Sequence, residues 1–154
     1  IKMAMACLPE EAMIDTPAGP RAVRDITAGD VVTGYRGHPV TVQQKHDYLE
    51  QASTVFIKVV FHDGASVEAC GRHRLAGTRL QDLEIGQGVA GRRVTALSTR
   101  CGLKRSYDLL TEDEGYRIDG IPVNSMIEEM QAAAASGMPL VARDARAVLA
   151  SSRP

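Results

Sequence analysis

The sequence predicts an all-β domain with a duplicated body and a helical appendage at its C-terminal end. Many short apolar segments are separated by glycine-marked turns, a spacing typical of an all-β body. A pattern in the first half of the chain recurs in the second half. The composition then changes beside Asn124-Ser125, where alanine and methionine replace the β-branched residues.

The expected strands are short. The clearest one spans 54–62, which is dense in Val, Ile and Phe. It turns at Asp63-Gly64, a dipeptide typical of β-hairpins, and returns as 66–70. The segment 79–83 is ambiguous between helix and strand. The other expected strands are 13–16, 22–26, 31–35, 40–46, 94–98, 106–111, 116–118 and 121–123.

Three stretches of the first half recur in order, with an offset in the fifties throughout. Residues 25–32 correspond to 82–89, Val40-Thr41 to Val94-Thr95, and the hairpin within 56–67 to 107–118, turning at Glu114-Gly115. A duplicated β-subdomain explains three ordered matches better than chance does.

The last part of the chain predicts helix. Ser125 is an expected N-cap with Glu128 at capping-box spacing, and Met126 and Met130 can share one face. Gly137 and Pro139 are expected to end this helix, and a second helix is expected over 140–150.

Composition excludes several classes of protein. Charged residues make up 24% of the chain and the net charge is −1, without a Lys/Arg block, so we expect neither nucleic acid nor an anionic membrane as a partner. No apolar run approaches the roughly 20 residues of a spanning helix. Three widely spaced cysteines form neither a disulfide framework nor a zinc ribbon, and we expect no metal or cofactor. Free thiols fit a reducing compartment without fixing the location.

Cys7 is the candidate nucleophile. It follows the small Ala6, which leaves the preceding carbonyl open to attack, and it precedes the first strand. A thiolate here can convert the preceding peptide bond to a thioester, given a base, oxyanion donors and a proton for the departing amine. The alternative is a small buried hydrophobe.

From Cys7 to about Ser125 the chain resembles the Hint superfamily, which includes inteins, bacterial intein-like domains and hedgehog C-terminal domains. The resemblance is carried by a cysteine ahead of a strand, two glycine turns, an internal motif ending in histidine, a Tyr-Asp-Leu strand and a Gly-x-x-Val ending: Cys7, Gly19-Pro20, Gly29-Asp30, Cys70-Gly71-Arg72-His73, Tyr107-Asp108-Leu109 and Gly120 to Ser125. It implies a pseudo-two-fold β fold in which the first cysteine attacks its own preceding peptide bond.

The resemblance also implies roles for the internal motifs. His73 would donate a proton to the departing nitrogen, Cys70 stands where threonine usually supports the oxyanion, and Asp108 would shuttle protons. A thiol is a weaker donor than a hydroxyl, so Cys70 departs from the family's pattern. The alternatives are a turn histidine at His73, a solvated strand aspartate at Asp108, and an inhibitory zinc site formed by Cys7, Cys70 and His73.

At the C-terminal junction, Asn124 can cyclise through its side-chain amide, and the hydroxyl of Ser125 can accept an acyl group. Counted from Gly120, however, Asn124 falls where the family's penultimate histidine stands, and Ser125 falls at the asparagine position. Either residue could therefore take the terminal position, and Asn124 could instead be a polar residue at the end of a strand.

The sequence thus predicts an autoprocessing domain over 7–124, a flanking segment over 1–6 and a helical flanking segment over 125–154. Its partner is its own flanking polypeptide, with water, a thiol or an amine as an external nucleophile, and we expect a monomer. The sequence leaves the location unknown, either in the cytoplasm or within a larger exported host protein. The alternative function is an inactive Hint-like scaffold that docks a partner through its helix.

Overall fold

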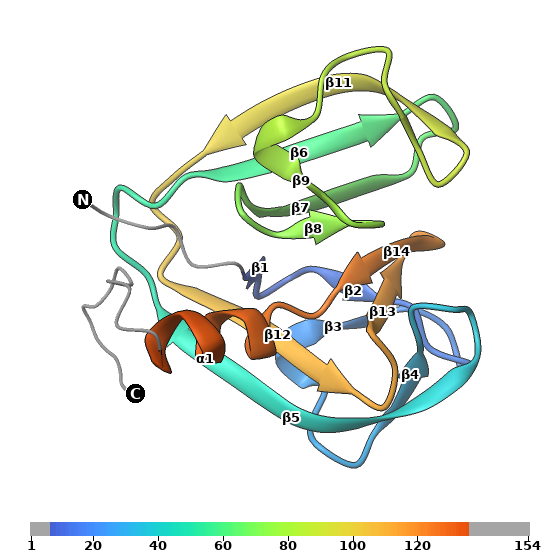
Figure 1. Ribbon diagram of the computed structural model, residues 1–154, viewed down its shortest axis with the longest axis vertical. Coiled ribbons are helices and arrows are strands. Elements are labelled where there is room, and N and C mark those ends of the chain that lie inside the picture. Colours follow the sequence, from blue (N-terminus) through green and yellow to red (C-terminus); the bar gives the residue numbers. More distant parts are fainter. Residues whose placement is uncertain (1–6, 136–154) are drawn as a thin grey trace.

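Two curled β lobes, with one helix packed beside the lower lobe, make up the computed structural model, which describes residues 7–135 (Figure 1). The lower lobe is built on a four-stranded sheet in the order β1-β12-β5-β4. These strands are antiparallel, and their bounds are Leu8–Pro9, Arg105–Thr111, Pro39–Leu49 and Val31–Thr33.

The upper lobe contains the second four-stranded sheet, in the order β10-β11-β6-β7. Its strands span Gly88–Val89, Arg92–Arg100, Phe56–Phe61 and Ser66–Cys70. The hairpin between β6 and β7 turns at Asp63-Gly64 as predicted, with Gly64 at φ +89°, and a glycine adopts this backbone conformation without steric cost.

A third sheet lies where the lobes meet and has the order β13-β14-β8-β9, over Gly115–Ile118, Ile121–Asn124, Arg74–Leu75 and Thr78–Arg79. A two-stranded sheet pairs β2 with β3, over Met13–Ile14 and Arg21–Ala22. Two short 3₁₀ helices, Val23–Asp25 and Leu80–Asp82, complete the body. Because β8 and β9 lie between the upper-lobe strands in sequence but pair with β14, this sheet connects the two lobes.

The predicted duplication is visible in the hydrogen bonds. Gly29 N donates to Val42 O and Gly86 N donates to Val94 O, both at 2.8 Å. Each of these glycines has φ +95° and follows a 3₁₀ helix. The duplication therefore aligns Val94 with Val42 and not with Val40, so the expected match at this point was two residues out of register.

Other predictions need correction in detail. Residues 22–26 were expected as a strand, but Val23–Asp25 is a 3₁₀ helix, and the ambiguous segment 79–83 contains its counterpart. Gly115 does not belong to a hairpin turn: it begins β13, which leaves β12 and pairs with β14. The expected symmetry of the two hairpins is therefore incomplete.

The helix α1 spans Ile127–Ala135, within the predicted segment. The capping box is absent, because the helix begins two residues after Ser125, and the Ser125 Oγ has no hydrogen-bond partner among the described residues. The expected second helix over 140–150 lies outside the described residues. No helix of the described chain has the length and apolar character to cross a membrane.

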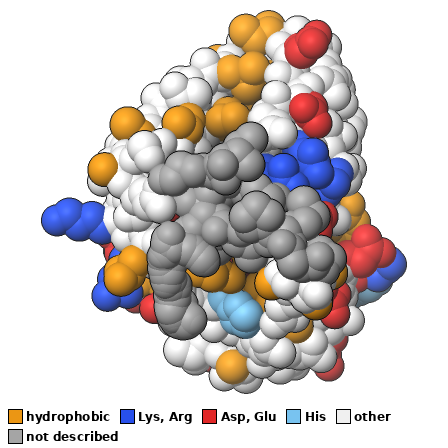
Figure 2. Space-filling model, turned by 60° about the vertical axis from the view of Figure 1, so that its left-hand side comes forward, with side chains coloured by type: hydrophobic (Ala, Val, Ile, Leu, Met, Phe, Trp, Pro, Cys, Tyr) orange, Lys and Arg blue, Asp and Glu red, His pale blue; other side chains and the backbone are white. Residues whose placement is uncertain are grey.

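The hydrophobic core is continuous through both lobes. Its largest buried members include Leu8, Phe61, Leu109, Tyr116 and Ile121, one from each of several strands. Figure 2 shows separate hydrophobic side chains at the surface too, and single exposed apolar residues such as Leu49 and Leu97 are ordinary for a folded protein.

Candidate functional site

Cys7 lies where three strands meet. Leu8 and Pro9 pair with Tyr107 and Ser106 of β12, and the Cys7 carbonyl accepts a 3.0 Å hydrogen bond from Cys70 N at the end of β7. The side chain is fully buried at 0% exposure. Burial raises the pKa of the Cys7 thiol well above its usual value, and the neighbouring acidic groups of Asp108, Cys70 and Glu50 raise it further. The resting thiol is therefore neutral and requires a base before it can attack.

Cys70 and His73 bound one tight turn. His73 N donates to Cys70 O at 3.0 Å, and the His73 carbonyl accepts from Leu80 N at 2.9 Å, which ties the turn to the second 3₁₀ helix. Both side chains are fully buried. Burial also raises the pKa of the Cys70 thiol, so this group is neutral and can only act as a weak donor.

Asp108 is the buried carboxyl of the site. Its Oδ1 accepts hydrogen bonds from Tyr116 Oη at 2.6 Å and from Leu109 N at 2.8 Å, and its Oδ2 accepts from Met126 N at 2.7 Å. Burial raises the pKa of Asp108 to about 7, although all three hydrogen bonds oppose this shift. At neutral pH the carboxyl is therefore poised to donate or accept a proton.

Tyr116 is a site residue that sequence reasoning missed. It is fully buried on β13, and its hydroxyl lies between Asp108 and His73, 3.5 Å from His73 Nε2. Burial, with the charge of Asp108, raises the pKa of the phenol well above its usual value, so the hydroxyl stays protonated. Only an aromatic residue on a short strand marks this position in the sequence, because the contact depends on how β13 packs against β12.

The C-terminal junction lies on the adjoining sheet. Asn124 pairs with Gly115 across the β13–β14 hairpin, and its Oδ1 accepts a 2.9 Å hydrogen bond from Gly77 N. Ser125 N donates to Glu114 O at 3.0 Å. The peptide N–H that reaches Asp108 is therefore that of Met126, one residue beyond Ser125.

The structure thus brings together Cys7, Cys70 and Asp108, with His73 joined through Tyr116. It places Asn124 and Ser125 outside this hydrogen-bonded group, although Met126 connects the two regions. Ala6 lies outside the described residues. Within residues 7–135, no group of three or more His, Cys, Asp or Glu is arranged to hold a metal ion, so the alternative zinc site is not formed.

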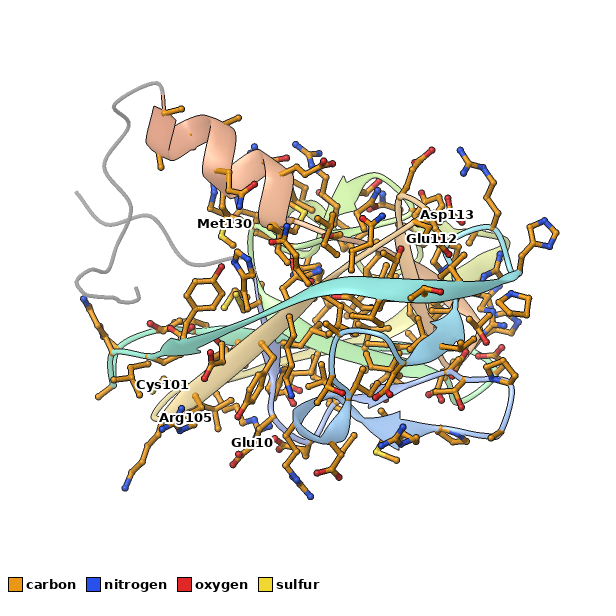
Figure 3. The ribbon with its side chains drawn as sticks, turned by 90° about the horizontal axis from the view of Figure 1, so that it is seen from below. Glu10, Cys101, Arg105, Glu112, Asp113 and Met130 are labelled. Atoms are coloured by element: carbon orange, nitrogen blue, oxygen red, sulfur yellow. The ribbon has the colours of Figure 1, made fainter. Side chains whose placement is uncertain are left out.

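The third cysteine is remote from this region. Cys101 is exposed. Figure 3 places it beside Arg105 at one end of the long β5–β12 pair, whereas Glu112 and Asp113 lie at the other end.

Solved structures of inteins and of a bacterial intein-like domain share this architecture. The gp41-1 intein matches with a TM-score of 0.62 and 16% identity, over 79% of this chain and 99% of the intein. A bacterial intein-like domain from Clostridium thermocellum matches with a TM-score of 0.65 and 17% identity, over 79% and 99%. The MchDnaB-1 intein variant matches with a TM-score of 0.64 and 19% identity, over 77% and 98%.

No family model matches the sequence, and no curated protein matches it. At these identities the structural likeness establishes the fold alone. The fold class is the intein-like β fold of these structures, which confirms the fold that the sequence resemblance predicted. Within that class, the chain has the intein-type fold: two curled β lobes, a buried cysteine at the start of the first strand, and a single C-terminal helix in the described part.

Proposed function

We propose that this chain is a self-processing domain in which Cys7 attacks the carbonyl of Ala6. The Cys7 thiol loses its proton, a bond forms between Sγ and the carbonyl carbon of Ala6, and the C–N bond to Cys7 breaks. The freed amine of Cys7 gains a proton. The step is an isomerisation that exchanges an amide for a thioester, so no co-reactant is consumed.

The observation that carries this proposal is the meeting of a buried thiol with a buried carboxyl at the first residue of the β body. The charge of Asp108 acts on the Cys7 thiol, and the pKa of Asp108 near 7 permits proton donation at neutral pH. Tyr116 joins Asp108 to His73, so a proton can be shared between the carboxyl and the imidazole. Asp108 and His73 would supply the proton for the departing amine.

We infer N-terminal cleavage as the main outcome, with water, a thiol or an amine resolving the thioester. Splicing would also require Asn124 to cyclise and Ser125 to accept the acyl group. The Asn124 amide is held by Gly77, and Asp108 binds the amide of Met126 instead of that of Ser125. Neither contact supplies a proton to the Asn124–Ser125 bond within the described residues, so the C-terminal step should be slow.

The processing unit on this proposal is 7–124, and its substrate is its own flanking polypeptide in a single turnover. The alternative, an inactive scaffold that docks a partner through the Met126/Met130 face of the helix, finds less support. Met126 is only 1% exposed, because its side chain is already packed inside the protein. That face is therefore mostly occupied.

Mass spectrometry of the intact purified chain tests the proposal. Incubation with dithiothreitol or hydroxylamine should release the peptide that ends at Ala6, seen as a loss of mass. Cys7→Ala should abolish the release, whereas Cys101→Ala should release normally, because it removes an exposed thiol remote from the site. Absence of release from the folded wild type would overturn the proposal.

Asn124 cyclisation is tested in the same experiment by a fragment that begins at Ser125. Asn124→Ala should abolish that fragment and leave N-terminal release intact. A fragment that appears equally from the variant would identify a contaminating protease as its source.

A further inference from the structure

A fully buried thiol needs a path along which its proton can leave. Cys7 is 0% exposed and its pKa is raised, so neither bulk water nor spontaneous ionisation provides that path. Asp108 is held by Tyr116, Leu109 and Met126, and its role in the proposed function is to deliver a proton to the amine. A second group is therefore required to remove the proton from sulfur.

Ser106 occupies the position for such a group. In a strand, alternate residues face the same side, so Ser106 and Asp108 both point toward Cys7 from β12. Ser106 is fully buried, and its side chain lowers the pKa of the Cys7 thiol, against the larger effect of burial. Its one hydroxyl proton is donated to Glu50 Oε2, so the lone pairs of Ser106 Oγ remain to accept a proton from the thiol.

Glu50 follows the last residue of β5 and leads into the crossing to the upper lobe. Its backbone N donates to Lys104 O at 2.9 Å, which fixes it beside the end of β12. Its side chain is partly buried, and it accepts hydrogen bonds from Ser106 and from Thr54. The chain Cys7–Ser106–Glu50 thus runs from a fully buried thiol to the carboxylate of a residue that is only partly buried.

We propose that Ser106 and Glu50 form the proton relay that activates Cys7, with Ser106 taking the thiol proton and passing its own to Glu50. This proposal rests on the proposed function. One proton leaves Sγ for Ser106 Oγ, the Ser106 proton moves to the Glu50 carboxylate, and the thiolate attacks the carbonyl of Ala6. Glu50 then loses the proton to water, and the amine receives a different proton from the His73, Tyr116 and Asp108 side.

The pKa of Glu50 suits its role as the final proton acceptor of the relay. Partial burial raises the pKa of Glu50, against the hydrogen bonds from Ser106 and Thr54, which lower it. A raised pKa makes the carboxylate a better base near neutral pH. The ionisable groups that face Cys7 from other elements are Asp108 on β12 and Cys70 on β7, and Tyr116 on β13 is coupled to the same thiol.

The test measures the rate of thiol-induced release against pH for wild type, Glu50→Gln and Ser106→Ala. Loss of a general base should slow release on the order of 100-fold at pH 7 in both variants. Log rate in the variants should rise with pH across the neutral range and approach that of the wild type in alkali, where hydroxide replaces the relay. Ser106→Thr, which keeps the hydroxyl, should restore most of the rate.

The matched control is Glu68→Gln, which removes a carboxylate from the surface ion pair with Arg100 and should leave the rate unchanged. A purely electrostatic Glu50 gives the opposite result: its charge raises the pKa of Cys7, so Glu50→Gln would accelerate release. Acceleration, an unchanged rate, or equal slowing by Ser106→Thr and Ser106→Ala would overturn the relay alone. Absence of release from wild type would overturn the relay together with the proposed function.

Discussion

The amide N–H of Met126 donates a 2.7 Å hydrogen bond to Asp108 Oδ2, while Asp108 Oδ1 receives the hydroxyl of Tyr116. One buried carboxyl therefore holds the first residues after β14 in place and also faces the thiol of Cys7. This arrangement couples the two ends of the proposed 7–124 unit through a single ionisable group. Its protonation state should affect both stability and chemistry, which gives the first two predictions.

Asp108 should make the stability of the protein depend on pH. Its pKa of about 7 in the folded state exceeds that of an exposed aspartate near 4, so the folded state binds more protons between these values. The favourable contribution is complete below about pH 4 and is lost as the pH rises through 7. Relative to Asp108→Asn, the unfolding free energy of wild type should fall by on the order of 4 kcal/mol across this window. Urea denaturation at several pH values measures it, and parallel curves for the two proteins would contradict it.

Tyr116→Phe should destabilise the protein more at high pH than at low pH. The phenol donates to Asp108 and lowers the pKa of that carboxyl, so its removal should raise this pKa above 7. Hydrogen bonds to charged groups contribute about 1.5–3 kcal/mol, and neutral ones about 1 kcal/mol. The loss should therefore be larger at pH 8.5 than at pH 5. Equal losses at both pH values would show that the phenol acts by packing alone.

Much of the fold follows from local sequence signals. The hairpin at Asp63-Gly64 and the duplicated glycine turns at Gly29 and Gly86 depend on backbone chemistry within a few residues. The predictions that were wrong concern residues whose contacts lie on segments distant in the sequence. Gly115 begins β13, which pairs with β14. Ser125 does not cap the helix, and the amide of the next residue, Met126, donates to Asp108.

The candidate site likewise contains residues that local motifs predict and residues that only the packing of distant segments places. Cys7, His73 and Asp108 carry motif signals, and the structure places them in or beside one buried group. Tyr116 on β13 and Glu50 just after β5 have no local signal, because each reaches the site only through the packing of segments far apart in the sequence. Ser106 does carry a local signal: it lies two residues before Asp108 on the same strand, so the two side chains share one face.

Gly115→Ala should be strongly destabilising. A Cβ at this residue would lie 1.9 Å from Val123 O and 2.9 Å from Ser125 N, both backbone atoms that cannot move independently. The β13–β14 pairing would have to open, at a cost above the roughly 1–3 kcal/mol typical of overpacking. Gly88→Ala is the matched control, since its Cβ meets no atom within 4 Å. Thermal unfolding of both variants measures the difference, and similar melting temperatures would contradict the close approach of Gly115 to β14.

Cys70→Thr should accelerate thioester formation at Cys7. Cys70 N already donates to the Cys7 carbonyl at 3.0 Å, so the side chain of residue 70 lies beside the nucleophile. Burial keeps the present thiol neutral, and a hydroxyl in its place is a stronger hydrogen-bond donor to a developing oxyanion. Release by dithiothreitol should rise about tenfold, equivalent to about 1.4 kcal/mol of transition-state stabilisation. Cys70→Ala separates the donor effect from the volume change: it should not exceed wild type, and equal acceleration by Ala and Thr would mean that the hydroxyl contributes nothing.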